Sequence, residues 1–98
     1  MNIIKTKEND TLTIALEGRL DTTTSPQLEG DLRNSVNGVT KLVFDLEKLD
    51  YISSAGLRVL LSAQKVMNRQ GDMVICHVQP EIMDIFDVTG FVDILNIE

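Results

Sequence analysis

Two adjacent serines, Ser53 and Ser54, lie in the stretch DLEKLDYISSAGLRVLL, just before Gly56. Residues 41–46 before them are a continuous apolar run typical of a buried strand, and the residues after them have the spacing of a helix. A serine hydroxyl between a strand and a helix could cap the helix, act as a catalytic nucleophile, or accept a phosphate from another enzyme. Each interpretation makes a different demand on the rest of the chain.

Capping makes the smallest demand on the sequence. A serine oxygen that accepts a free backbone N–H at a helix start is worth about 1 kcal/mol relative to alanine. A nucleophile instead needs a base, a group that orients the base, and donors for an oxyanion. The only histidine, His77, lies in an apolar stretch, and no G-x-S-x-G motif surrounds the serines. We therefore do not expect an enzyme.

A phosphate acceptor fits the local sequence better than a nucleophile does. Phosphate on Ser54 would add about −1.5 to −2 charges at a helix N-terminus, where free N–H groups and the helix dipole favour an anion. Arg58, four residues on, would lie within reach, whereas Asp21 and Asp50 would oppose the phosphate if their loops came close. Phosphorylation would then change the surface more than the fold, as a switch read by a partner requires.

The sequence offers little for metal or cofactor binding. Cys76 and His77 are neighbours in the expected strand 72–78, where alternate side chains point to opposite faces, so they should not share a zinc ion. Asp21, Asp45 and Asp50 could bind a cation, but acidic loop residues are more often solvated. No phosphate-binding G-x-x-x-x-G-K-[ST] motif is present. We expect no metal and no cofactor.

Length and charge limit the partners. The 98 residues suit a single domain spanning 1–98. A formal net charge of −6 would repel nucleic acid, so we expect no nucleic-acid partner. No apolar run reaches the roughly 18 to 20 residues that membrane insertion needs, and the first residues do not resemble a signal peptide. These features predict a cytoplasmic protein.

The pattern of apolar residues predicts the order β-β-α-β-α-β-α-β. A period of two or a continuous apolar run marks strands, and a period near four marks helices, with Ser25 as a helix cap and Pro26 at the first helical position. The expected strands are 2–6, 12–17, 41–46, 72–78 and 94–97, and the expected helices are 25–37, about 54–71 and 80–88. This alternation predicts an α/β fold with a largely parallel sheet, in which the loops LDTTT and ISSAGLR meet at one edge.

Four stretches together resemble a known family over nearly the whole chain: GRLDT (18–22), LVFDLEKLDYISSAGL (42–57), GDMVICHVQP (71–80) and IFDVTGF (85–91). They are similar to the anti-sigma factor antagonists of the STAS domain family. The resemblance implies a single STAS-like domain with a curved, mixed, mostly parallel sheet of about five strands and helices packed mainly on one side.

The resemblance also implies a switch residue. In that family, a loop of the form D-S-[ST]-G-L carries a serine that the anti-sigma factor, itself a serine kinase, phosphorylates; the unphosphorylated form binds the kinase and frees a sigma factor. Aligning this loop on Gly56-Leu57 puts Ser54 on the phosphorylated serine. The implied partners are this kinase and a serine phosphatase. The implied binding residues are Asp21, Thr22, Thr23, Ser53, Ala55, Gly56, Leu57 and Arg58.

Two positions depart from the family loop, since Ser53 replaces the aspartate and Ala55 replaces the second hydroxyl. Some family members are never phosphorylated. The alternative function is therefore a STAS interaction subunit of a transport or signalling complex that has no phosphorylation switch.

Overall fold

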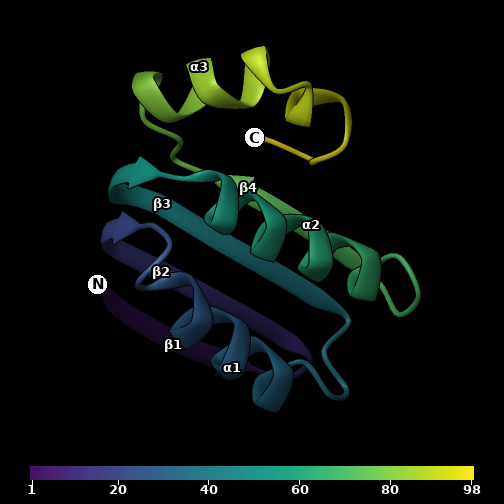
Figure 1. Cartoon of the computed structure of the whole chain (residues 1–98). Coiled ribbons are helices and arrows are strands. Elements are labelled where there is room, and N and C mark those ends of the chain that lie inside the picture. The colour runs from purple at the N-terminus through teal and green to yellow at the C-terminus, as the bar shows by residue number, and fades with distance from the viewer.

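Strands and helices alternate along the chain after an initial pair of strands (Figure 1). The computed structural model describes residues 1–98. The elements are β1 (Asn2–Glu8), β2 (Thr11–Leu20), α1 (Ser25–Ser35), β3 (Lys41–Ile52), α2 (Ser54–Met67), β4 (Asp72–Cys76), α3 (Pro80–Val88) and the 3₁₀ helix η1 (Phe91–Asp93). The predicted α/β order is confirmed as far as α3.

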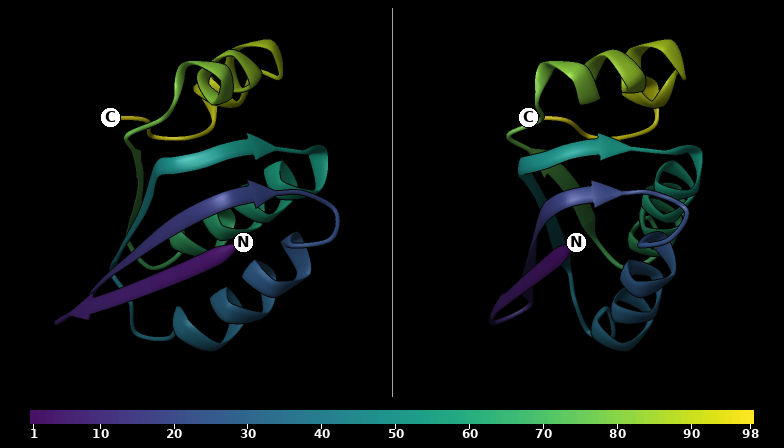
Figure 2. Two further views of the ribbon diagram at one scale, coloured as in Figure 1. Left: turned by 90° about the vertical axis from the view of Figure 1, so that its left-hand side faces the viewer. Right: turned by 60° about the vertical axis from the view of Figure 1, so that its left-hand side comes forward.

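The four strands form one mixed sheet in the order β1-β2-β3-β4. The first pair is an antiparallel hairpin, and β2, β3 and β4 are mutually parallel. Helices α1 and α2 lie side by side on one face of this sheet (Figure 2). Because each of these helices connects two parallel strands, the loops that leave β2 and β3 emerge at the same edge.

The core lies between the sheet and α1 and α2. In β2, Leu12, Ile14 and Leu16 are buried, and the residues between them are half-buried, as the period of two predicts. Helix α2 buries Leu57, Leu60, Ala63 and Met67 and exposes Arg58, Ser62 and Lys65, which confirms the expected polar stripe up to the end of the helix; Arg69 is exposed in the turn that follows.

Strand β3 is twice as long as expected, because it continues through EKLDYI to Ile52. Its register with β2 shifts at two points, each of which inserts an extra residue into β3. The buried positions therefore change from every second residue, up to Leu46, to every third residue, at Leu49 and Ile52. Bulges of this kind redirect side chains while the strand continues. Here they extend β3 to the start of α2.

The expected fifth strand at 94–97 is not formed as a strand, so the sheet has four strands rather than about five. Residues 91–93 form η1, and only Ile97 pairs with the sheet, through an isolated parallel bridge to Ile75. Helix α3 lies apart from α1 and α2, beyond the β4 side of the sheet (Figure 2), and buries Ile82 and Phe86. None of the helices has the length and apolarity needed to cross a bilayer.

Candidate functional site

The start of α2 holds the two serines in different environments. Ser53 is the N-cap residue, with extended backbone angles, and its hydroxyl oxygen accepts a hydrogen bond of 3.4 Å from Gly56 N–H. Ser54 is the first helical residue, is exposed, and makes no side-chain hydrogen bond within the chain. The capping interpretation therefore belongs to Ser53, and the Ser54 hydroxyl is left free.

Gly56 is the point at which α2 touches the ends of β2 and β3. A Cβ atom added there would come within 2.8 Å of Ile52 Cγ1 and of Leu20 Cγ. Both neighbours are buried, at 2% and 0% exposure, so neither has free space to move into. A residue without a side chain at this position is thus required for α2 to pack this closely on the sheet.

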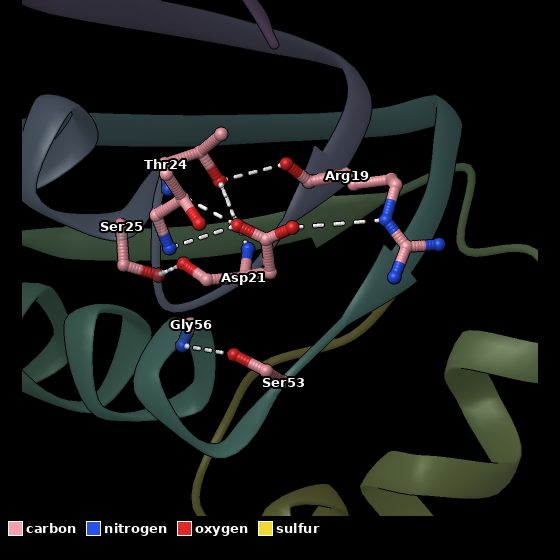
Figure 3. A network of polar contacts seen from close by, with 7 residues as sticks. Arg19, Asp21, Thr24, Ser25, Ser53 and Gly56 are labelled. Atoms are coloured by element: carbon pink, nitrogen blue, oxygen red, sulfur yellow. Dashed lines mark hydrogen bonds and ion pairs between the residues drawn. The ribbon is translucent and has the colours of Figure 1, made fainter.

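The loop between β2 and α1 is built around Asp21 (Figure 3). Its Oδ1 accepts hydrogen bonds from Thr23 N–H (3.0 Å) and Thr24 N–H (3.1 Å), and Thr24 Oγ1 accepts one from Asp21 N–H (2.9 Å). Ser25, expected to cap α1, is instead buried, and its hydroxyl donates to the Asp21 carbonyl oxygen. The cap expected at Ser25 is wrong, because Thr24 is the N-cap residue, no side chain caps α1, and Ser25 is the first helical residue.

The same hydrogen bonds lower the pKa of Asp21 below the ordinary aspartate value. The Thr24 backbone N–H is the largest cause; desolvation opposes it, and the Thr23 N–H, the Thr24 hydroxyl and the Arg19 guanidinium lower the pKa further. A lowered pKa means that the loop is stabilised above the ordinary aspartate pKa and loses this stabilisation as the pH falls through the lowered one. Asp21 is therefore ionised and engaged within its own loop at neutral pH.

The two loops meet at one edge of the sheet, as the sequence predicts. Ser53 N–H donates to the Leu20 carbonyl oxygen (2.9 Å), which joins the end of β2 to the start of α2. Figure 3 shows the Asp21 network next to the Ser53 cap. A shallow depression lies between the two helix starts and is lined by Thr22, Ser25, Pro26, Glu29, Ala55, Arg58, Val59 and Ser62.

Some of the predicted binding residues reach this surface and others do not. Thr22, Thr23 and Arg58 are exposed and Ala55 is half-buried, so these four are open to a partner. We call Thr22, Thr23, Ser54, Ala55 and Arg58 the two-loop surface. Gly56 and Leu57 are buried, and Leu57 is only 6% exposed, so the structure gives both a packing role. The partner contact expected for them stays a prediction.

Two residues beside this surface were not predicted from the sequence. Arg19 and Tyr51 are register partners on β2 and β3, and the Arg19 guanidinium lies 4.3 Å from the centre of the Tyr51 ring. Arg19 Nε also lies 3.6 Å from Asp21 Oδ2, which ties the pair to the Asp21 loop. Tyr51 is 38% exposed and is thus an aromatic contact available to a partner. Tyr51 was not recognised as a strand residue because β3 was expected to end at residue 46.

Cys76 and His77 do not lie on opposite faces of one strand, so that prediction is wrong. Strand β4 ends at Cys76, and His77 has a φ of +57°, so the two residues are not alternating positions of one strand. The ligand atoms of Asp45, Cys76 and His77 all lie within 4.8 Å of one another. Asp21 and Asp50 do not belong to this group.

The fold agrees with comparison to known proteins. The family model described as the STAS domain matches residues 2–98, and the chain belongs to the STAS domain family. It is 37% identical to the Bordetella bronchiseptica protein named "Putative anti-sigma factor antagonist BtrV", over 99% of this chain and 85% of that one.

Two further relatives extend the comparison. The anti-sigma-B factor antagonist of Listeria monocytogenes is 31% identical over the whole of this chain and 90% of its own length. The solved structure of the Bacillus cell fate determinant SpoIIAA in its phosphorylated form matches with a TM-score of 0.78 at 18% identity, covering 99% of this chain and 91% of that one. At this low identity the likeness shows the shared fold.

We predict that Gly56→Ala destabilises the domain by about 1 to 2 kcal/mol. Overpacking against Leu20 and Ile52 costs about 1 to 3 kcal/mol, and the better helix propensity of alanine returns up to about 1 kcal/mol. Gly30→Ala is the matched control, because a Cβ at Gly30 in α1 meets no atom within 4 Å and should be neutral or stabilising. Urea unfolding measures both variants, and equal stability of the two would contradict the packing role of Gly56.

We also predict that Asp21→Ala loosens the β2–α1 loop. The amides of Thr23 and Thr24 lose their acceptor, so their NMR protection factors should fall at neutral pH while those of the sheet stay unchanged. In the wild type the same two factors should fall on acidification through the lowered pKa of Asp21. Asp50→Ala is the control, since Asp50 is exposed and its side chain makes no hydrogen bond or ion pair within the chain. If the protection factors of Thr23 and Thr24 are the same in Asp21→Ala as in wild type, the Asp21 carboxylate does not hold this loop together.

Proposed function

We propose that this chain is an anti-sigma factor antagonist controlled by phosphorylation of Ser54. Its unphosphorylated form binds an anti-sigma factor that is a serine kinase, and thereby releases a sigma factor. Phosphorylation of Ser54 ends that binding, and a serine phosphatase restores it. The chain is the substrate and binding partner in this cycle rather than an enzyme, and the cycle operates in the cytoplasm, where transcription is regulated.

The observation that carries the proposal is the difference between the two serines. A kinase needs a hydroxyl that solvent and a second protein can reach, and the Ser54 hydroxyl is exposed and unbonded. The Ser53 hydroxyl is half-buried and caps the helix. The names of the relatives, anti-sigma factor antagonist and anti-sigma-B factor antagonist, support the same role at the level of the family.

Charge alone is enough to operate the proposed switch. The first turn of α2 offers backbone N–H groups and the positive end of the helix dipole, so the fold tolerates an anion on Ser54. Arg58 is exposed and takes part in none of the ion pairs within the chain, so it can pair with the added phosphate. The two-loop surface would then keep its shape and change its charge.

The partner would detect that change of charge as a cost of desolvation. Burying a phosphate that lacks a full set of partners in an interface costs several kcal/mol, and each 1.4 kcal/mol lowers affinity about tenfold. Pairing with Arg58 reduces the surface charge without removing it, because a phosphoserine carries more than one negative charge. Binding can therefore be lost without any rearrangement of the sheet or helices.

We predict that Ser54, and not Ser53, accepts the phosphate. Incubation with ATP and an anti-sigma factor kinase from the same cell should label wild type and leave Ser54→Ala unlabelled. Ser53→Asp is the matched variant, because aspartate keeps the N-cap and removes the competing hydroxyl, and it should be labelled like wild type. Phosphopeptide mapping by mass spectrometry reads the site, and phosphate on Ser53 in the Ser54→Ala variant would overturn the assignment.

We further predict that Ser54→Asp weakens binding to the anti-sigma factor kinase by about tenfold or more. The melting temperature of this variant should stay within about 2 °C of wild type. Ser54→Ala should bind like wild type, since the hydroxyl itself adds little. Lys7→Ala is the control, because Lys7 is exposed on β1 and has no ion pair within the chain. Calorimetric titration of the kinase measures each affinity.

Equal binding of wild type and Ser54→Asp to the kinase, together with no phosphate on Ser54, would show that the chain has no phosphorylation switch. The better description would then be the alternative, a STAS interaction subunit of a transport or signalling complex that is never phosphorylated.

A further inference from the structure

Three side chains of different chemistry converge near the carboxyl end of β4, away from the two-loop surface. They are Asp45 from β3, Cys76 at the last position of β4, and His77 in the loop that leads to α3. One ligand atom from each lies within 4.8 Å of the other two, and His77 Nδ1 is 3.0 Å from Asp45 Oδ1. A carboxylate oxygen, a thiol sulfur and an imidazole nitrogen thus face one another.

The backbone explains why these residues meet. Asp45 and Cys76 are register partners on the parallel strands β3 and β4, so their side chains point to the same face of the sheet. Phe44 and Leu46, on either side of Asp45, are fully buried and point to the other face. At His77 a positive φ of +57° ends the strand alternation, and the ring turns toward Asp45. Positive φ in a residue other than glycine is uncommon and costs free energy.

We propose that Asp45, Cys76 and His77 form a binding site for a zinc-like divalent transition-metal ion. Mixed sulfur, nitrogen and oxygen donors are the set that zinc takes in proteins. Zinc lies about 2.0 to 2.3 Å from such donors, so the donors around one tetrahedral ion are roughly 3.3 to 3.7 Å apart. The three side chains need to move by about an ångström to reach that arrangement, within the range of side-chain rotation.

The surroundings of the site are open and negative. Side-chain exposure of 60% for His77 and 30% for Asp45 gives an ion a direct path from solvent. Burial raises the pKa of the Cys76 thiol, and the nearby carboxylates of Asp45 and Glu98 raise it further. The same negative charge that disfavours a bare thiolate attracts a divalent cation, which in turn stabilises the thiolate.

The bound state balances as a simple exchange. The thiol of Cys76 gives its proton to solvent and binds the ion as thiolate, His77 binds as neutral imidazole through Nδ1, and Asp45 binds as carboxylate. These three ligands leave one tetrahedral position, which a water molecule can fill. The Asp45–His77 pair and a hydrogen bond from Gln79 Nε2 to the Glu47 carbonyl oxygen hold the loop after β4 against β3. A bound ion would strengthen this connection.

This site is distinct from the serine at the start of α2. Asp45 and Ile52 pair with Ala15 and Leu20, which are five positions apart on β2, and this corresponds to roughly 17 Å at about 3.3 Å per residue. Metal binding therefore does not depend on the proposed phosphorylation, and either proposal can fail without the other.

The composition of the chain makes the test unusually clear. Cys76 is the only cysteine and His77 the only histidine, so thiol reactivity and imidazole NMR signals both report this site alone. Chelator-treated protein is titrated with Zn²⁺ alone, and with Co²⁺ alone as a spectroscopic probe. We expect one ion per chain, protection of Cys76 from a thiol reagent, shifted His77 ring signals, a cobalt–thiolate absorption band, and a melting temperature that rises with zinc.

Variants separate the site from the general attraction of an acidic surface for cations. Cys76→Ser and His77→Gln should each weaken zinc binding by tenfold or more, and Asp45→Asn should weaken it to a smaller degree. Glu29→Gln is the control, because Glu29 is an exposed carboxylate paired with Arg33 on α1, and it should bind zinc like wild type. The melting temperature of the apo forms checks that each variant folds.

Two results would overturn the proposal. One is equal zinc affinity of wild type and the double variant Cys76→Ser/His77→Gln. The other is a Cys76 thiol that reacts as fast with zinc present as without it. In either case the Asp45–His77 pair has only a structural role, which is to connect β3 to the loop before α3.

Discussion

The close packing of α2 against the ends of β2 and β3 is the constraint on which the candidate switch depends. Gly56 permits it, because a Cβ there would fall within 2.8 Å of the buried side chains of Leu20 and Ile52. The backbone bond from Ser53 N–H to the Leu20 carbonyl oxygen fixes the same junction. Ser54 follows directly, so its outward direction is set by the core beneath it rather than by contacts of its own.

Rigid surroundings suit a switch that works through charge. On one side of the junction, the Asp21 carboxylate holds its own loop together by accepting hydrogen bonds from the backbone N–H groups of Thr23 and Thr24. On the other side, the Ser53 cap begins α2. Neither arrangement uses the Ser54 hydroxyl, so a phosphate can be added there without breaking an interaction that the fold needs. The change is confined to what a partner meets at the surface.

The regular parts of the fold could be predicted from the sequence, because apolar periodicity reports which face each element buries. The alternation of Leu12, Ile14 and Leu16 and the spacing of residues on α2 correctly located β2 and α2. The bulges of β3 change the period from two to three, and this concealed both its full length and the position of Tyr51 beside the serine loop. Ser54 could be singled out over Ser53 as the expected phosphate acceptor by aligning the family loop on Gly56-Leu57, and the observed cap at Ser53 adds a structural reason for that choice. The positive φ at His77 has no simple sequence signal, and for that reason the convergence of the Asp45, Cys76 and His77 side chains could not be predicted.

Comparison of two-dimensional amide NMR spectra before and after stoichiometric phosphorylation tests the central claim most directly. If the switch changes charge on a preformed surface, shifted signals should be confined to residues 19–25 and 51–58, and the signals of β1, β4 and α3 should not move. Shifts spread through the sheet and α3, or a loss of dispersion, would show that phosphate acts by rearranging the fold and would contradict this account.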